Sequence, residues 1–136
     1  MAERLAALGL LLALSLGAAA ETRTTRFSFS GWDVAFGRKS WAITTTICNK
    51  DRDGNAGTFD FQFRLVRGGS YYVVGSRHGR PPAHPGNCMA FEGFKVPVRL
   101  GGLPHGTYEV WIDLAEKTGD KWTTVKKVKL DKNFVL

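Results

Sequence analysis

A regular alternation of apolar and polar side chains is the feature that most limits how this chain can fold. It is clearest in TFDFQFRLV, residues 58–66, where Phe59, Phe61, Phe63 and Leu65 alternate with polar residues. Side chains point alternately to the two faces of a β-strand, so a period of two predicts a strand with one buried face. We therefore expect a β-protein whose strands each need an apolar partner surface.

The same period recurs between short, glycine-rich turns along most of the chain. The segments that show it are 27–36, 41–48, 58–66, 70–76, 91–100, 107–114 and 121–130. The alternation breaks at Gly31 and slips at Lys126–Lys127. Seven short antiparallel strands with one apolar face each predict an immunoglobulin-like β-sandwich, with a small barrel as the alternative.

Residues 1–20 have the plan of a secretory signal peptide. Arg4 gives a charged start, a long apolar run follows, and three alanines stand directly before Glu21. We predict cleavage after Ala20. An uncleaved anchor is the alternative, but the apolar run of about sixteen residues is shorter than the ~20 that a spanning helix needs. We expect a secreted or periplasmic protein without a transmembrane segment, with one domain over residues 21–136.

The chain is basic, with 19 Lys and Arg against 12 Asp and Glu and a net charge of +7. Such an excess favours acidic partners such as lipid headgroups, acidic glycans or nucleic acid. The charges are scattered singly along the predicted strands, however, and export argues against a nucleic-acid partner. Even the densest group fits the solvated face of a strand; it consists of Lys126, Lys127, Lys129 and Lys132.

The two cysteines, Cys48 and Cys88, predict a structural disulfide, because an exported chain meets an oxidising compartment. Cys48 lies on the opposite strand face from Ile43 and Ile47, and we expect Cys88 to lie in a loop rich in proline and glycine. We therefore expect the bridge to tie a strand end to a loop rather than to join two sheets through the core. A metal pair or a redox pair is the alternative, but no CxxC motif is present to favour a thioredoxin-like role.

Two segments carry a resemblance to a known family. In ITTTICNKDRDGNAGTFDFQFRLV (43–66) an alternating strand ends in Asn, and a loop with Gly and Ala-Gly leads to the next strand. In LPHGTYEVWIDLAEKTGD (103–120) a Gly-x-Tyr precedes an alternating run that ends in Asp. These features resemble the CARDB family, the cell adhesion related domain found in bacteria, and related bacterial immunoglobulin-like domains share them. The usual closing Asn-Asn of the family is missing. The resemblance implies a bacterial extracellular sandwich used for surface attachment or as a module, with no catalytic residues.

The stretch DRDGN spaces three oxygen-bearing side chains two apart, as in a calcium loop: Asp51, Asp53 and Asn55. An EF-hand loop has glycine at position 6 and an acid at position 12, where this sequence has Ala56 and Gln62. We interpret the stretch as a turn between two strands, with calcium binding as the alternative.

The segment 76–89, SRHGRPPAHPGNCM, is the least strand-like part of the chain. It concentrates positive charge at Arg77, His78 and Arg80, which we take as candidate binding residues on a loop presented by a rigid sandwich. A long crossing loop held by the disulfide is the simpler interpretation. A copper site is a further alternative, and its ligands would be His78, His84, Cys88 and Met89.

Trp111 is the last candidate, because it shares a strand face with Glu109 and Asp113 rather than with apolar residues. Such a ring can stack on a sugar or anchor a protein interface. The alternative is a ring covered by a neighbouring strand or loop. We expect Trp32 and Trp41 to lie in the core or at a sheet edge.

Motifs of common enzyme classes are missing: the chain has no GxSxG, HExxH, P-loop or GxGxxG. Its three histidines, His78, His84 and His105, stand beside Gly or Pro without a carboxylate nearby in the sequence. We expect no enzyme, no cofactor and no metal. The predicted function is an exported adhesion or protein-interaction module that binds a protein or an envelope component. The alternatives are an inhibitor or toxin-like protein acting through the 76–88 loop, and a glycan-binding protein. Either a monomer or an edge-paired dimer is compatible with the sequence.

Overall fold

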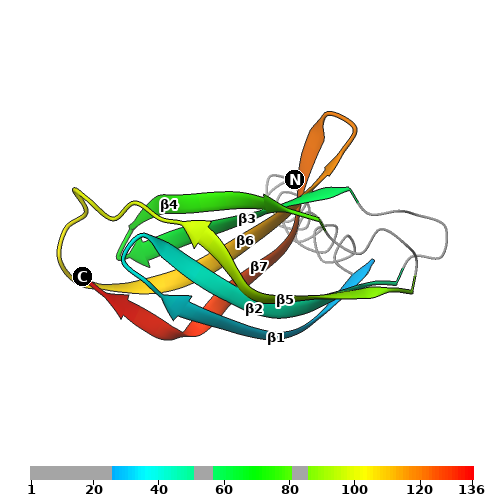
Figure 1. The fold of residues 1–136 in the computed structure, drawn as a ribbon. Helices are drawn as coiled ribbons and strands as arrows, with labels where there is room; N and C mark the ends of the chain where they lie inside the picture. Colours follow the sequence, from blue (N-terminus) through cyan, green and yellow to red (C-terminus); the bar gives the residue numbers. More distant parts are fainter. Residues whose placement is uncertain (1–25, 51–56, 81–85) are drawn as a thin grey trace, which may run out of the picture.

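The computed structural model describes residues 26–50, 57–80 and 86–136, which form an all-β protein (Figure 1). No helix occurs among these described residues. The strands are β1 (Phe27–Phe36), β2 (Ser40–Asn49), β3 (Thr58–Arg67), β4 (Ser70–Gly79), β5 (Cys88–Pro97), β6 (Thr107–Thr118) and β7 (Lys121–Val135). Each strand overlaps one of the seven segments predicted from the alternation, so the predicted fold class is confirmed.

The strands form two antiparallel sheets that pack face to face as a sandwich (Figure 1). The smaller sheet has the order β1-β2-β5, and the larger has the order β4-β3-β6-β7. The hairpins β1–β2, β3–β4 and β6–β7 stay within one sheet, whereas the chain changes sheet after β2, β4 and β5. The fourth strand therefore extends the larger sheet. In antibody constant domains it lies at the edge of the other sheet instead.

Two glycines keep aromatic side chains of the smaller sheet on its inner face. Gly31, with a φ of 65°, adds a residue to β1, so that Phe29 and Trp32 on either side of it both pack against the core. Gly93, with a φ of 62°, lies in the same way between two inward-facing phenylalanines of β5. Both conformations are left-handed, a region that glycine enters at little cost and that marks many β-bulges. The break predicted at Gly31 is confirmed.

The hairpin of β6 and β7 reaches beyond the rest of the larger sheet (orange in Figure 1). Its register shifts beside Val125, because Leu114 pairs with Lys126 while Ala115 pairs with Thr124. The sequence predicts a slip of the alternation at Lys126–Lys127, and the irregularity lies directly before these two residues.

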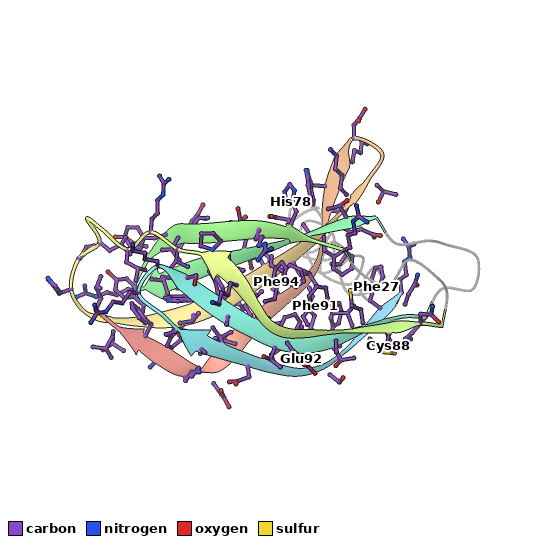
Figure 2. The ribbon with its side chains drawn as sticks, in the orientation of Figure 1. Phe27, His78, Cys88, Phe91, Glu92 and Phe94 are labelled. Atoms are coloured by element: carbon purple, nitrogen blue, oxygen red, sulfur yellow. A yellow bond between two sulfur atoms is a disulfide. The ribbon has the colours of Figure 1, made fainter. Side chains whose placement is uncertain are left out.

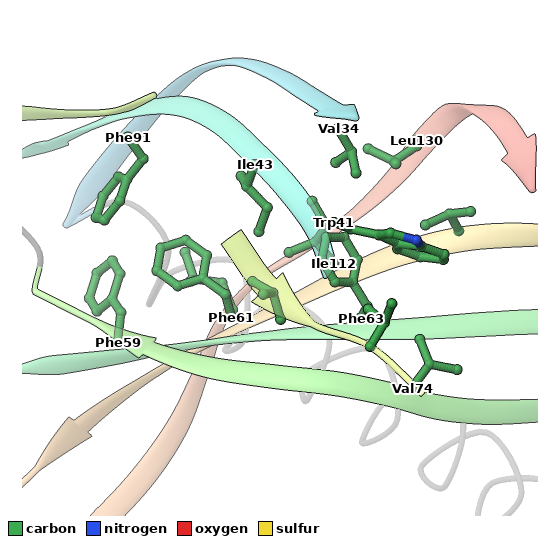
Figure 3. Close-up of a cluster of buried hydrophobic side chains, with 14 of the residues drawn as sticks. Val34, Trp41, Ile43, Phe59, Phe61, Phe63, Val74, Phe91, Ile112 and Leu130 are labelled. Carbon is green, nitrogen blue, oxygen red and sulfur yellow. The ribbon is translucent and has the colours of Figure 1, made fainter. Parts of the chain in front are cut away.

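The core fills the space between the two sheets, where the inward residues of β3 and β6 meet those of β1, β2 and β5 (Figure 3). Trp41 lies near its middle, with its ring centroid 5.0 Å from that of Phe63 and its indole nitrogen donating to the Gly37 carbonyl oxygen at 3.2 Å. The largest fully buried side chains are Trp41, Tyr108, Phe59, Phe61, Phe63, Ile43, Ile47, Leu65, Ile112, Leu114, Val34 and Val96. The apolar face predicted for residues 58–66 thus forms one side of the core.

Tyr108, near the start of β6, fixes the corner where the chain enters that strand. Its ring is fully buried and its hydroxyl donates to the carbonyl oxygen of Pro104, four residues earlier. Immunoglobulin-like sandwiches have a corresponding tyrosine corner at the same strand, where the hydroxyl bonds back to the upstream backbone. The Gly-x-Tyr of the sequence therefore has a structural role in the turn before β6.

The disulfide between Cys48 and Cys88 is confirmed, but its location differs in part from the prediction. The two residues form a register pair of the neighbouring strands β2 and β5, with their Cα atoms 4.0 Å apart. As expected, the bridge does not join the two sheets. The expectation that Cys88 lies in a loop was wrong, because Cys88 is the first residue of β5.

Candidate binding surface

The structure places much of the predicted 76–88 binding loop in regular strands. β4 continues to Gly79, so Arg77 and His78 are strand residues, and only Arg80 of the three candidates follows the strand. The expectation of a long loop from residue 76 was therefore wrong. Residues 81–85, which include the copper candidate His84, lie outside the described residues, and so do all three calcium candidates, which fall within 51–56.

Arg77 has a role within the fold, because it connects the edge of β4 to the edge of β5. Its Nη1 donates a hydrogen bond of 2.7 Å to the carbonyl oxygen of Lys95. Its guanidinium carbon lies 4.5 Å from the centroid of the Phe94 ring. Arg77 therefore links the edges of the two sheets, and its side chain stays exposed to solvent.

The copper alternative loses its thiol ligand, because the sulfur of Cys88 is bonded to Cys48. Among the described residues, no group of three or more His, Cys, Asp or Glu side chains is placed to hold a metal ion.

His78 lies on the outer face of the larger sheet (Figure 2). Its Nε2 is 3.6 Å from Oδ1 of Asp60 on the next strand, and its ring centroid is 5.1 Å from that of Trp122 on β7. The Asp60 oxygen is buried and has no hydrogen-bond partner among the described residues. Burial raises the pKa of Asp60, and the nearby His78 opposes this shift. Trp122 was not a candidate from the sequence.

Cross-strand pairing builds this outer face as rows of four residues, one from each strand of the larger sheet. In the order β4, β3, β6, β7 the rows are Tyr71–Val66–Glu109–Asn133, Val73–Arg64–Trp111–Lys129, Ser76–Gln62–Asp113–Lys127 and His78–Asp60–Ala115–Thr124. We call these rows, with Lys117 and Trp122 beyond the last, the outer face. The rows bring His78 and Trp111 of the sequence-based candidates onto one surface, whereas Arg77 lies at its margin.

An ion pair occupies the centre of the outer face. Nε and Nη2 of Arg64 donate to the two carboxylate oxygens of Asp113 at 2.7 and 3.1 Å. Both side chains are about four-fifths buried, with exposures of 20% and 19%. The hydrogen bond to Asp113 is the main cause that raises the pKa of Arg64, against the opposing effect of burial. A planar pair of this kind fixes the position of both groups.

Trp111 is half-buried beside this pair. The guanidinium carbon of Arg64 lies 5.1 Å from its ring centroid, and its indole nitrogen donates to Glu109 at 3.3 Å. Glu109 also meets Lys129 at 3.3 Å. These hydrogen bonds, first from Trp111 and then from Lys129, lower the pKa of Glu109. Trp111 is thus partly covered by Arg64 of the neighbouring strand and lies on the face that meets solvent; its role in binding stays a prediction.

A shallow depression of about 440 Å³ lies beside the ion pair. Its lining consists of Gln62, Arg64, Tyr71, Val73, Asp113 and Lys127. The rim on the β4 side is apolar and open, since Tyr71 is 66% and Val73 53% exposed. This site could not be recognised from the sequence, because its residues come from all four strands of the larger sheet and meet only through their register.

Comparison with models of known protein families gave no match, and no curated protein and no solved structure matched the chain. The resemblance to the CARDB family stays a prediction. In the described part of the chain, no helix has the length and apolar character needed to cross a membrane.

Proposed function

We propose that this protein is an exported, non-enzymatic binding module of the cell envelope or the extracellular space, and that it holds its partner on the outer face of the larger sheet. The signal-peptide pattern of residues 1–20 supports export. The disulfide is compatible with an oxidising compartment.

The observation that carries the proposal is the exposure of large apolar side chains on the outer face. Tyr71, Val73 and Trp122 are 66%, 53% and 42% exposed. Tyr71 and Val73 stand together on β4, and Trp122 stands apart beside His78. Exposed apolar side chains surrounded by polar groups are typical of interaction sites. The central strands of this sheet, β3 and β6, are buried on their inner side at every second position. Such support limits the freedom that is lost when a partner binds.

The alternative, an inhibitor that inserts the 76–88 segment into a target enzyme, has less support. Arg77 and His78 belong to strand β4 rather than to a projecting loop, and Arg77 already donates a hydrogen bond to the Lys95 carbonyl.

The test is co-sedimentation of the purified mature protein, residues 21–136, with cell-wall and membrane fractions. The test variant, Tyr71→Ser with Val73→Thr, removes apolar surface from the outer face. The matched control, Met89→Ser, removes exposed apolar surface on the smaller sheet, since Met89 lies on β5 and is 37% exposed.

We expect the wild type and the control variant to sediment with an envelope fraction and the test variant to stay in solution. Equal retention of both variants would refute the outer face as the binding site. A wild type that stays in solution, or that instead captures one soluble enzyme, would refute the envelope module.

A further inference from the structure

The depression beside the Arg64–Asp113 pair offers hydrogen-bond donors that the fold does not use. Arg64 employs Nε and Nη2 on Asp113, and its Nη1 has no partner among the described residues. The side chains of Gln62 and Lys127 likewise make no hydrogen bond or ion pair with the residues that the structure describes, although both line the depression. Polar groups of this kind, converging on one hollow, are what orients a bound ligand.

The depression also keeps one acceptor available, the carboxylate of Asp113. A carboxylate has about four lone-pair positions, and Arg64 occupies two of them. The remaining positions suit the hydroxyl groups of a ligand. Because Arg64 and Asp113 neutralise each other, the unpaired ammonium of Lys127 gives the depression a net positive charge. The site therefore favours a ligand that carries both hydroxyl donors and an anionic group.

The open rim adds a flat apolar surface. Tyr71 exposes 66% of its area next to Val73. A sugar ring has an apolar C–H face and a polar edge, so it can lie against an exposed aromatic ring while its hydroxyls reach polar groups beside it. A DNA phosphodiester chain has no sugar hydroxyl to donate to Asp113, which makes single-stranded DNA the poorer fit.

We propose that this depression binds an acidic saccharide, a sugar ring that carries a carboxylate. The proposal rests on the proposed binding function of the outer face and names the class of ligand. The carboxylate lies against Lys127 and the free edge of Arg64, the ring hydroxyls bond to Asp113 and Gln62, and the C–H face lies on Tyr71.

The experiment is isothermal titration calorimetry of the mature protein with a tetramer of galacturonic acid. The fully methyl-esterified tetramer is the matched ligand, because it keeps the sugar rings and removes the charge. Lys127→Met is the test variant. Lys129→Met is its matched control on the same strand and face, where the ammonium is already paired with Glu109 at 3.3 Å. Melting temperatures verify that both variants are folded.

We expect the charged tetramer to bind, and the methyl ester and the Lys127→Met variant each to lower the affinity about tenfold, as for the loss of one charged hydrogen bond. Lys129→Met should retain the affinity of the wild type. Equal losses in both lysine variants, equal binding of the methyl ester, or equally tight binding of a single-stranded oligonucleotide would overturn the proposal, and so would the absence of binding.

The two proposals fail in different ways. If the uronate does not bind but the Tyr71 and Val73 substitutions still release the protein from envelope fractions, only the ligand class is wrong. If neither effect is seen, the proposed function is wrong as well.

Discussion

Removing the disulfide should destabilise the protein through its unfolded state. The bridge joins the register pair Cys48 and Cys88 at one end of the smaller sheet. Hydrogen bonds continue on the far side of the bridge, from the Asn49 nitrogen to the Asn87 carbonyl at 2.9 Å and from the Gly86 nitrogen to the Asn49 carbonyl at 2.7 Å. Because the sheet is bonded beyond the bridge, we expect the double variant Cys48→Ala with Cys88→Ala to keep its native structure.

The size of the effect follows from the length of chain that the bridge closes. The cysteines are separated by 40 positions in the sequence. In the chain-entropy model a loop of this length contributes about 4 kcal/mol to the free energy of unfolding. For a domain of this size the melting temperature should fall by about 15 °C.

The assay is urea unfolding of the double variant and of the wild type with and without reductant, followed by tryptophan fluorescence. The reduced wild type is the control, because it loses the bridge without a substitution and should match the variant. The slope of the free energy against urea should also rise, since an unbridged chain exposes more surface on unfolding. A loss below about 1 kcal/mol would refute the entropic argument. An altered near-ultraviolet circular dichroism spectrum of the double variant in the absence of urea would show that the bridge acts on the structure of the folded state instead.

Three further variants test the core, a buried charge and a bulge. Phe63→Ala empties a fully buried position and should lower the free energy of unfolding by about 3–5 kcal/mol in urea unfolding, unless the core closes around it. Burial raises the pKa of Asp60 above its usual 3.8, so the folded protein holds this proton more tightly than the unfolded chain does. The free energy of unfolding therefore falls as the pH rises from 3.8 through the raised pKa. Asp60→Asn should therefore raise stability at pH 7. Thermal melts from pH 3 to 7 would contradict this if the variant kept the wild-type dependence of stability on pH. Gly31→Ala should cost about 1 kcal/mol, because alanine is strained at a φ of 65° although its Cβ meets open space. Gly69→Ala, with equal space and no positive φ, is its control, and equal melting temperatures for the two would refute the role of φ.

The strands could be predicted from the sequence because most of them carry apolar residues at every second position. The end of β4 is the exception, and the reason lies in its inward positions. Gly79 is buried beneath aromatic rings, and a Cβ there would lie 2.8 Å from the Phe61 ring. Arg77 occupies the preceding inward position at the sandwich edge, where its guanidinium covers Phe94. With glycine and arginine in place of apolar residues, the period of two disappears while the strand continues.

The candidate surface was less accessible to prediction, because it depends on which strands become neighbours. Trp111 could be identified from its own strand, since it alternates with apolar residues. Its contact with Arg64 and the pairing of Arg64 with Asp113 require β3 and β6 to be adjacent in one particular register. Trp122 meets His78 across the full width of the sheet, where Ala115 is too small to separate them. Contacts of this kind follow from the sheet order, which local periodicity does not encode.

The two outer faces of the sandwich differ in what they can offer a partner. The outer face of the smaller sheet presents mainly small side chains, among them Ser28, Ser30, Ala35, Ala42, Thr44, Thr46 and Ala90. Binding energy is concentrated in large aromatic and arginine side chains, and these lie on the larger sheet. The inner sides of β3 and β6 are fully buried at every second position, so the side chains opposite them stand on strands that cannot easily shift. A rigid support of this kind keeps Arg64, Asp113 and Trp111 in place before a ligand arrives, which lowers the entropy lost on binding. Large side chains and a rigid support thus coincide on the larger sheet, and on physical grounds this is where recognition is expected.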